Sequence, residues 1–149
     1  VSNLANQIAG YDSRTYGRVG STELIRMLSA EPVDVLHNAV LITINKRYRS
    51  NMTEIELFES TRGIWVIGSR RELAEYAMAV YQGVVREVYS INNWYPAGTL
   101  TYETRDTKGF KGSGRWEFDG AIAPSIIRNK YIYKKVGMSG QNPIRYSNC

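Results

Sequence analysis

The chain has 149 residues, of which 43% are hydrophobic and 22% are charged. This length suits one domain, and this composition excludes wholesale disorder. Neither an apolar run of about 20 residues that could span a bilayer nor a secretory leader is recognisable, so the sequence predicts a cytoplasmic protein with no membrane partner. A single cysteine, Cys149, and a single histidine, His37, exclude an intramolecular disulfide and a His/Cys metal cluster.

Positive charge gathers in the second part of the chain. Residues 1–60 hold six Lys/Arg and seven Asp/Glu, whereas residues 61–149 hold thirteen and seven. The net charge of +5 and the isoelectric point near 9.4 therefore come from the second segment. Such a segment predicts either a basic face suited to phosphates or a solvated basic surface, and charge alone leaves both open.

The first elements in chain order are an irregular arm, a helix and a buried strand. Residues 1–19 mix Ser, Asn, Gly and Tyr without a clear period and form the arm. Apolar residues at helical spacing predict a helix over 22–29, which Pro32 ends. The run VLITIN (40–45) is rich in β-branched residues and almost wholly apolar, which predicts a strand buried on both faces.

The next helix begins at the strongest local signal in the sequence. Thr53 and Glu56 form a T-x-x-E capping box, which predicts a helix over 54–62. Gly63 would end this helix in the left-handed conformation. The short apolar run IWVI (64–67) would continue as an extended segment.

Further elements follow with shorter signals. An S-x-x-E motif at 69–72 predicts one or two helical turns from residue 70, and the apolar residues after it predict a strand from about residue 77. GVVREVYSI (83–91) predicts the next strand. Residues 92–113 are rich in Asn, Gly, Thr and Lys and predict a long loop, which is either functional or disordered.

The last third of the chain returns to strands. RWEFDGAIA (115–123) alternates in polarity and predicts a strand with Trp116, Phe118 and Ile122 on one face. The remaining expected elements are a helical turn over 124–129 and strands over 131–136 and 144–148. Six or seven short strands with two or three short helices predict an α+β protein, a small and partly open β-barrel with helices at its ends.

Motifs for catalysis are absent or incomplete. The sequence has no GxxxxGK[ST] and no GxGxxG, and one histidine cannot form a Ser/His/Asp or Cys/His set. A small metal-dependent nuclease or nucleotide-processing domain could use Glu87, Asp106 and Lys108. Asp106, however, falls in a loop predicted to be flexible, which would hold a metal ligand poorly. We therefore expect no catalysis by this chain alone, no cofactor and no metal, with the nuclease as the enzyme alternative.

The three tryptophans lie in the basic segment, each near arginine or polar residues. Aromatic rings stack on nucleobases, while arginine and lysine neutralise phosphates. Trp116 alternates with Phe118 and is expected in the core. Trp65 lies in an apolar run that leaves core and ligand contact open. Trp94 lies in a polar loop and is the best candidate for exposed stacking.

Two adjacent arginines and the tyrosines leave alternatives open. Arg70 and Arg71 could contact phosphate at the start of a predicted helix, or they could form surface ion pairs with Glu72 and Glu75. Eleven tyrosines suit protein contact as well as nucleic-acid contact. A protein-interaction domain with a tyrosine-rich surface is therefore a third hypothesis.

From residue 40 onward, VLITIN opens the barrel, a capped helix follows, and a glycine-led strand begins at Gly83. RWEFDGAIA is the next long strand, and IRNKYIYKKV (127–136) is a late helix end followed by a strand. In this order of elements the chain resembles the PUA-like superfamily, the group of EVE, YTH and ASCH domains and related modified-base readers. Residues 1–39 would then form an N-terminal arm and helix, and residues 40–149 the PUA-like barrel domain.

The resemblance implies an open barrel face with an aromatic pocket for a flipped or unpaired base, modified bases included. By placement, Trp65 and Trp94 would lie near this pocket, and Arg62, Arg70 and Arg71 would line its approach. We therefore expect a nucleic-acid-binding module, with DNA favoured over RNA, in a restriction or RNA-modification system whose nuclease is another domain or subunit. The residues expected to contact base or phosphate are Trp65, Trp94, Tyr95, Arg62, Arg70, Arg71 and Arg115.

Overall fold

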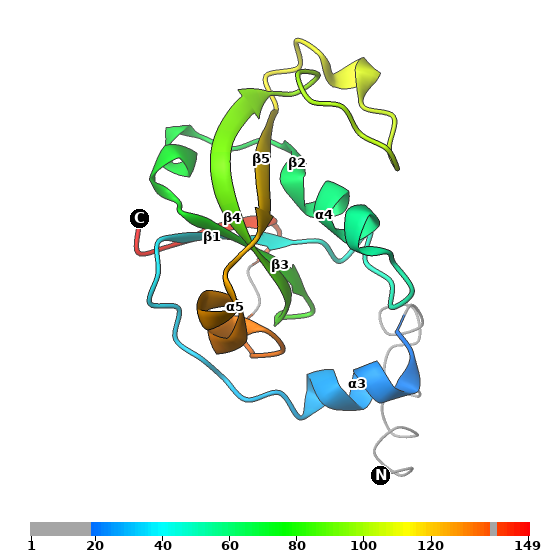
Figure 1. Cartoon of the computed structure of the whole chain (residues 1–149), viewed down its shortest axis with the longest axis vertical. Helices are drawn as coiled ribbons and strands as arrows, with labels where there is room; N and C mark the ends of the chain where they lie inside the picture. The colour runs from blue at the N-terminus through cyan, green and yellow to red at the C-terminus, as the bar shows by residue number, and fades with distance from the viewer. Residues whose placement is uncertain (1–18, 138–139) are drawn as a thin grey trace.

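The computed structural model describes residues 19–137 and 140–149, so the arm predicted for residues 1–19 lies almost wholly outside the described residues. The described chain forms a six-stranded sheet in the order β2-β5-β4-β3-β1-β6, with helices packed around it (Figure 1). The strands are β1 (Ala39–Thr43), β2 (Gly63–Trp65), β3 (Tyr76–Tyr81), β4 (Val84–Pro96), β5 (Trp116–Ile122) and β6 (Ile144–Ser147). The helices are α3 (Ser21–Leu28), α4 (Glu54–Arg62) and α5 (Ser125–Tyr131), with two 3₁₀ turns, η1 (Ser69–Leu73) and η2 (Lys108–Phe110).

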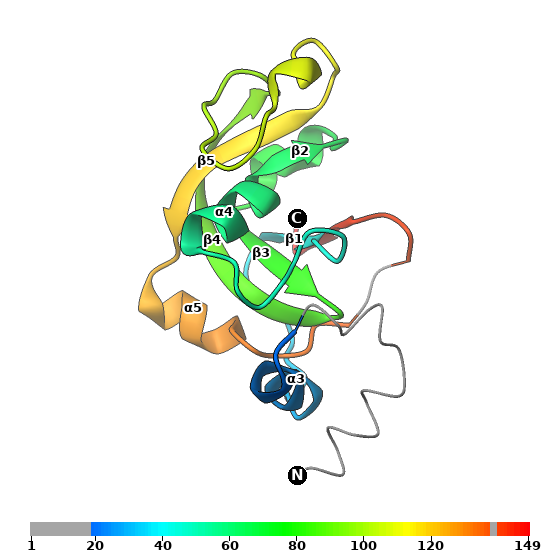
Figure 2. The same cartoon turned by 90° about the vertical axis from the view of Figure 1, so that its right-hand side faces the viewer.

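The long strand β4 gives the sheet its curvature. It has 13 residues and pairs antiparallel with β3 on one side and with β5 on the other. The register shifts once in each pairing, next to Ala79 of β3 and between Ile91 and Asn93 of β4. Such bulges bend a strand and increase its twist. Two perpendicular views show the sheet curled into half a barrel (Figure 1, Figure 2), which confirms the α+β, partly open barrel.

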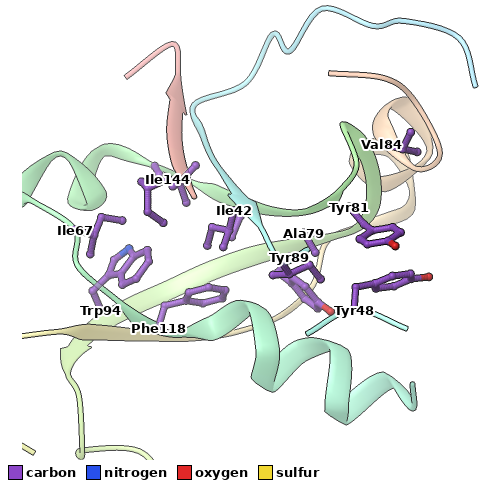
Figure 3. Close-up of a cluster of buried hydrophobic side chains, with 14 of the residues drawn as sticks. Ile42, Tyr48, Ile67, Ala79, Tyr81, Val84, Tyr89, Trp94, Phe118 and Ile144 are labelled. Carbon is purple, nitrogen blue, oxygen red and sulfur yellow. The ribbon is translucent and has the colours of Figure 1, made fainter. Parts of the chain in front are cut away.

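Alternate side chains of β1 pack on opposite faces of the sheet, as its apolar sequence predicts. Val40 and Ile42 join the core cluster that α4 covers, whereas Ala39 and Leu41 join the cluster that α5 covers. The first cluster also contains large aromatic side chains from three strands and the turn after β1 (Figure 3): Tyr48, Tyr81, Tyr89, Trp94 and Phe118. The central strands are therefore buried on both faces of the sheet.

Helix α4 begins where the sequence predicts. The Thr53 hydroxyl accepts the Glu56 N–H at 3.2 Å, and the Glu56 carboxylate accepts the Thr53 N–H at 3.0 Å, which together form the capping box. The prediction for Gly63 is wrong, because its φ of −168° is extended and the chain enters β2 directly. A Cβ on Gly63 would nevertheless collide with the Tyr102 hydroxyl, so a larger residue there would displace that side chain.

The structure corrects the predicted ends of two elements. β4 continues to Pro96, so the long loop runs over residues 97–115 rather than 92–113. No strand forms over 131–136: α5 extends to Tyr131, and Lys135 makes only isolated bridges to Pro32 and Val84. The helices at 21–28 and 125–131 and the strand at 144–147 agree with the sequence within a few residues.

The faces of β5 differ from the alternation that the sequence predicts. Phe118 is buried as expected, but Ile122 is 45% exposed. Glu117, expected on the polar face, is completely buried, because its carboxylate accepts backbone N–H groups of the 97–115 loop. Within the described residues, no helix combines the length and the apolar character needed to cross a membrane.

Candidate functional site

Two adjoining cavities open where the turn after β1 meets α4 and β6. Their volumes are about 370 Å³ and 330 Å³. Lys46 and Arg47 line both of them. We name residues 44–50 the basic turn, the larger space the cationic cavity and the smaller one the Trp65 cavity. Because Lys46 and Arg47 belong to both linings, the two cavities are neighbours in the structure.

The cationic cavity lies between the basic turn, α4 and the 97–115 loop. Its lining residues are Lys46, Arg47, Arg49, Met52, Glu56, Ser60, Thr104 and Arg105. Four of these are cations and one, Glu56, is an anion, which pairs with Arg49 at 2.5 Å. Within the described part of the chain, Arg47 and Arg105 form no ion pair. The lining therefore carries more cations than anions, and two of its arginines lack a close ion pair among the described residues.

The basic turn is held by one inward-facing tyrosine. The Ile44 carbonyl accepts the N–H groups of Arg47 and Tyr48 at 3.0 and 2.9 Å, which closes the turn. Tyr48 is 2% exposed, and its ring lies 4.6 Å from that of Tyr81 (Figure 3). Its hydroxyl donates to Glu23 of α3. Because Tyr48 points into the core, its neighbours at 46, 47 and 49 can line the two cavities.

Two buried carboxylates anchor the 97–115 loop, Glu59 of α4 and Glu117 of β5. The backbone donors are Glu103 and Thr104 for Glu59 and Thr99 and Leu100 for Glu117, at 2.6 to 3.1 Å. A carboxylate that accepts two N–H groups holds a loop more firmly than neutral acceptors do. The loop predicted to be functional or disordered is thus fixed on the sheet, and this places Thr104 and Arg105 at the cationic cavity.

Arg105 is a partly buried cation without a carboxylate partner among the described residues. Its Nη1 donates to the carbonyl oxygens of Glu59 and Gly63 at 2.7 and 2.5 Å, which fix the side chain but do not neutralise it. Burial lowers the pKa of the Arg105 guanidinium, and repulsion from the positive charge of Arg47 lowers this pKa further. A bound anion would relieve this repulsion.

The Trp65 cavity has a different character. Its lining residues are Thr43, Ile44, Asn45, Lys46, Arg47, Trp65, Gly140, Gln141 and Pro143. Trp65 is half-buried at the end of β2, and its Nε1 donates to the Thr61 carbonyl at 2.7 Å, which fixes the indole ring. A fixed aromatic ring beside an amide and two cations suits a planar ring that carries polar edges.

Two of the predicted base-contacting residues lie elsewhere. Trp94 is not in a polar loop but within β4, where it is 8% exposed and its ring lies 5.1 Å from that of Phe118 (Figure 3). The expectation of exposed stacking at Trp94 is therefore wrong, because bulged β4 continues past this residue and turns its side chain into the core. Tyr95 is half-buried on the same strand, opposite Glu117 of β5.

The predicted arginines Arg62 and Arg70 already interact with other residues of this chain. Arg62 is only 7% exposed, donates to the Phe118 carbonyl at 3.0 Å and lies 3.6 Å from the Asp119 carboxylate. It does not line an approach to either cavity, because it closes the C-terminal end of α4 against β5. The exposed Arg70 donates to the Cys149 carbonyl and lies over the Tyr146 ring.

Arg71 and Arg115 support the edge of the sheet around β2 and β5. The Arg71 guanidinium lies 3.4 Å over the Trp116 ring, and its Nε is 3.1 Å from the Glu72 carboxylate. This ion pair is the surface alternative that the sequence left open. Arg115 donates to the Ile64 carbonyl at 3.5 Å, next to Trp65 in the chain. Of the predicted site residues, Trp65 lines one of these two cavities, and the predicted arginines line neither.

The residues of the nuclease alternative are not brought together. Glu87 forms a two-point ion pair with Arg128 of α5, at 2.6 and 3.2 Å. Asp106 accepts the Lys108 N–H within the 97–115 loop, which lies at the opposite end of the sheet from α5 (Figure 1). Across residues 19–137 and 140–149, no group of three or more His, Cys, Asp or Glu side chains could hold a metal ion.

The net charge of each segment does not reveal the cations that line the two cavities. Lys46, Arg47 and Arg49 fall within residues 1–60, whose net charge is −1. Their signal is local, since KRYR places three cations within four residues directly after a buried strand. Arg105 has no comparable signal, because its position depends on the loop anchors Glu59 and Glu117.

Comparison of the chain with protein-family models, with curated proteins and with solved structures finds no match. The geometry of the two cavities is therefore the basis for the functional argument.

Proposed function

We propose that this chain binds nucleic acid and reads one unpaired base in the Trp65 cavity, with the adjoining phosphates in the cationic cavity. The observation that carries the proposal is the adjacency of the two spaces through Lys46 and Arg47. A nucleotide has an aromatic base at one end and an anionic phosphate at the other, and the linings of these neighbouring cavities contain an aromatic ring and a cluster of cations.

The chemistry of binding follows from these side chains. Stacking of a base on an aromatic ring contributes roughly 1 to 3 kcal/mol. Contacts between cations and phosphates release counterions, which makes the affinity depend steeply on salt. Gln141, which lines the Trp65 cavity, carries an amide that can donate to or accept from a base edge. The chain supplies binding in this proposal, and cleavage belongs to another domain or subunit.

The resemblance to the PUA-like superfamily adds finer proposals. It suggests that the base is modified and that the setting is a restriction or RNA-modification system. DNA is the favoured partner in this proposal. A modified base differs from a plain one by a small group on the ring, so discrimination would depend on how the ring packs in the Trp65 cavity.

Substitution of Trp65 tests the proposal. We expect Trp65→Ala to weaken binding of single-stranded oligonucleotides by about 1 to 3 kcal/mol, and Trp65→Phe to weaken it less, because phenylalanine still stacks. Fluorescence anisotropy with labelled oligonucleotides measures both. Trp116→Phe is the matched control, since Trp116 stacks on Arg71 outside the cavities.

Oligonucleotides with one altered position test base reading. Wild-type protein should bind a strand more tightly when one internal nucleotide keeps its base than when that nucleotide is abasic. Trp65→Ala should lose discrimination between a modified and a plain base more than it loses binding itself. A folded Trp65→Ala protein that binds all these strands as wild type does would refute base reading in this cavity.

A further inference from the structure

The lining of the cationic cavity includes two arginines that form no ion pair among the described residues. Arg105 is fixed by the neutral carbonyl oxygens of Glu59 and Gly63, and the charge of Arg47 repels it. The carboxylates of Glu59 and Glu117 also attract Arg105, but among the described residues neither lies within ion-pair distance of it. Arg49 has its own anion in Glu56. Arg47 and Arg105 are therefore the two arginines of this lining that form no ion pair with a described carboxylate.

An internal phosphodiester carries one negative charge, whereas a phosphomonoester carries about −1.5 to −2 near pH 7 and offers three terminal oxygens. Two guanidinium groups can neutralise such a dianion and can each donate to it in pairs. The charge of two arginines in one lining thus matches a monoester better than a single diester. Ser60 of α4 adds a hydroxyl to the lining.

The neighbouring cavity determines which groups can be attached to the phosphate. The cationic cavity, at about 370 Å³, is larger than a phosphate group and has room for an attached sugar. Lys46 and Arg47 also line the Trp65 cavity, where the base of the same nucleotide would lie. A single nucleotide with a terminal phosphate would therefore place its phosphate in one space and its base in the other.

We propose that the cationic cavity binds a phosphomonoester through Arg47 and Arg105, so that the nucleotide held against Trp65 is one with a terminal phosphate. This inference rests on the proposed function and narrows it from any unpaired base to a phosphorylated end. The same chemistry occurs in a free nucleoside monophosphate, so the test separates the two sources.

Single-stranded oligonucleotides of one sequence, with a 5′-phosphate, a 3′-phosphate or hydroxyl groups at both ends, test the inference by fluorescence anisotropy. A phosphate at one end should raise the affinity by about tenfold or more, because it adds charge-assisted hydrogen bonds to two arginines. Arg47→Gln should abolish this preference. Arg26→Gln, which removes an exposed arginine from α3, should keep it. Inorganic phosphate and a nucleoside monophosphate serve as competitors.

Four outcomes are distinguishable. An end-phosphate preference that Arg47→Gln removes supports the inference. Equal affinity for phosphorylated and unphosphorylated strands overturns it and leaves the proposed function standing, as does a preference that survives Arg47→Gln. Competition by the nucleoside monophosphate, with no binding of any oligonucleotide, supports the phosphate site and overturns the proposed function in nucleic-acid binding.

Discussion

Thr104 donates both its backbone N–H and its hydroxyl to the buried carboxylate of Glu59, at 2.6 and 2.5 Å. The Glu103 N–H donates to the other carboxylate oxygen at 2.7 Å. These bonds join α4 to the middle of the 97–115 loop, and the next residue along the chain is Arg105. One buried acid on the helix therefore determines where an arginine of the loop lies relative to the cationic cavity.

Glu59→Gln should lower the free energy of unfolding by about 1.5 to 3 kcal/mol. A neutral amide keeps one acceptor oxygen and places an NH₂ group against backbone donors, so charge-assisted bonds are lost. Chemical denaturation measures this change. Oligonucleotide affinity should also fall in the folded variant, because Arg105 is no longer held at the cavity. Glu75→Gln, an exposed acid just before β3, should change stability by less than about 0.5 kcal/mol. Equal effects of the two substitutions would contradict the anchoring role of Glu59.

Glu23 makes the fold sensitive to acid. Burial raises the pKa of its carboxyl, but hydrogen bonds from Ser50 and Tyr48 and the positive charge of Arg86 outweigh burial, so the pKa lies below its ordinary value of 4.5. A carboxyl group whose pKa is lowered by folding stabilises the protein at pH values above its ordinary pKa. This stabilisation is lost as the pH falls through the folded-state pKa. Glu23→Gln should therefore destabilise the protein by about 2 to 3 kcal/mol at pH 7 and by progressively less below pH 4.5.

Denaturant titrations at pH 7 and at several acidic pH values measure how the difference in stability between wild type and Glu23→Gln decreases. Asp34→Asn is the control, because Asp34 is an exposed acid before β1 and should change stability little at any of these pH values. A destabilisation by Glu23→Gln that stays constant down to the acid unfolding region would show that the carboxylate charge is not what holds α3 and Tyr48 together.

Trp94→Ala should destabilise the protein by about 3 to 5 kcal/mol, as truncation of a large buried side chain does. The indole lies within the core cluster that α4 covers, and its Nε1 finds no hydrogen-bond partner among the described residues. Trp94 therefore contributes to stability through packing. Thermal and chemical unfolding measure the loss. Asn93→Ala, at the exposed neighbouring position, should change stability by less than about 0.5 kcal/mol. A stable Trp94→Ala protein with weakened oligonucleotide binding would restore the stacking role expected from the sequence.

Local signals in the sequence identify most elements of the fold. The capping box determines the start of α4 through contacts between Thr53 and Glu56, three residues apart, and the β-branched run at 40–45 identifies β1. The end of β4 could not be found in this way. Asn92 and Asn93 look like loop residues, but the bulge that accommodates them is stabilised by pairing with β5, which lies far along the chain.

The candidate site depends still more on distant contacts. An aromatic residue in a basic segment is a local signal, and it selects Trp65, which lines a cavity. The burial of Trp94 has no such signal, because it depends on Phe118 across the sheet. Arg105 could not be selected, since its place is determined by two acidic residues whose burial no local pattern predicts. Burial of Glu59 and Glu117 is explained only by the backbone donors of the loop.

The salt dependence of oligonucleotide binding, in wild type and in Arg47→Gln, tests the central claim most directly. Anisotropy titrations of a labelled single strand over a series of salt concentrations give the slope of log K against log salt. The wild-type slope should be steeply negative, and Arg47→Gln should weaken binding and reduce the slope by about 0.7 for each phosphate that it no longer neutralises. Arg26→Gln should leave a slope close to that of wild type. Absence of binding at low salt, or an Arg47→Gln slope equal to that of wild type, would contradict the assignment of nucleic-acid binding to the two cavities.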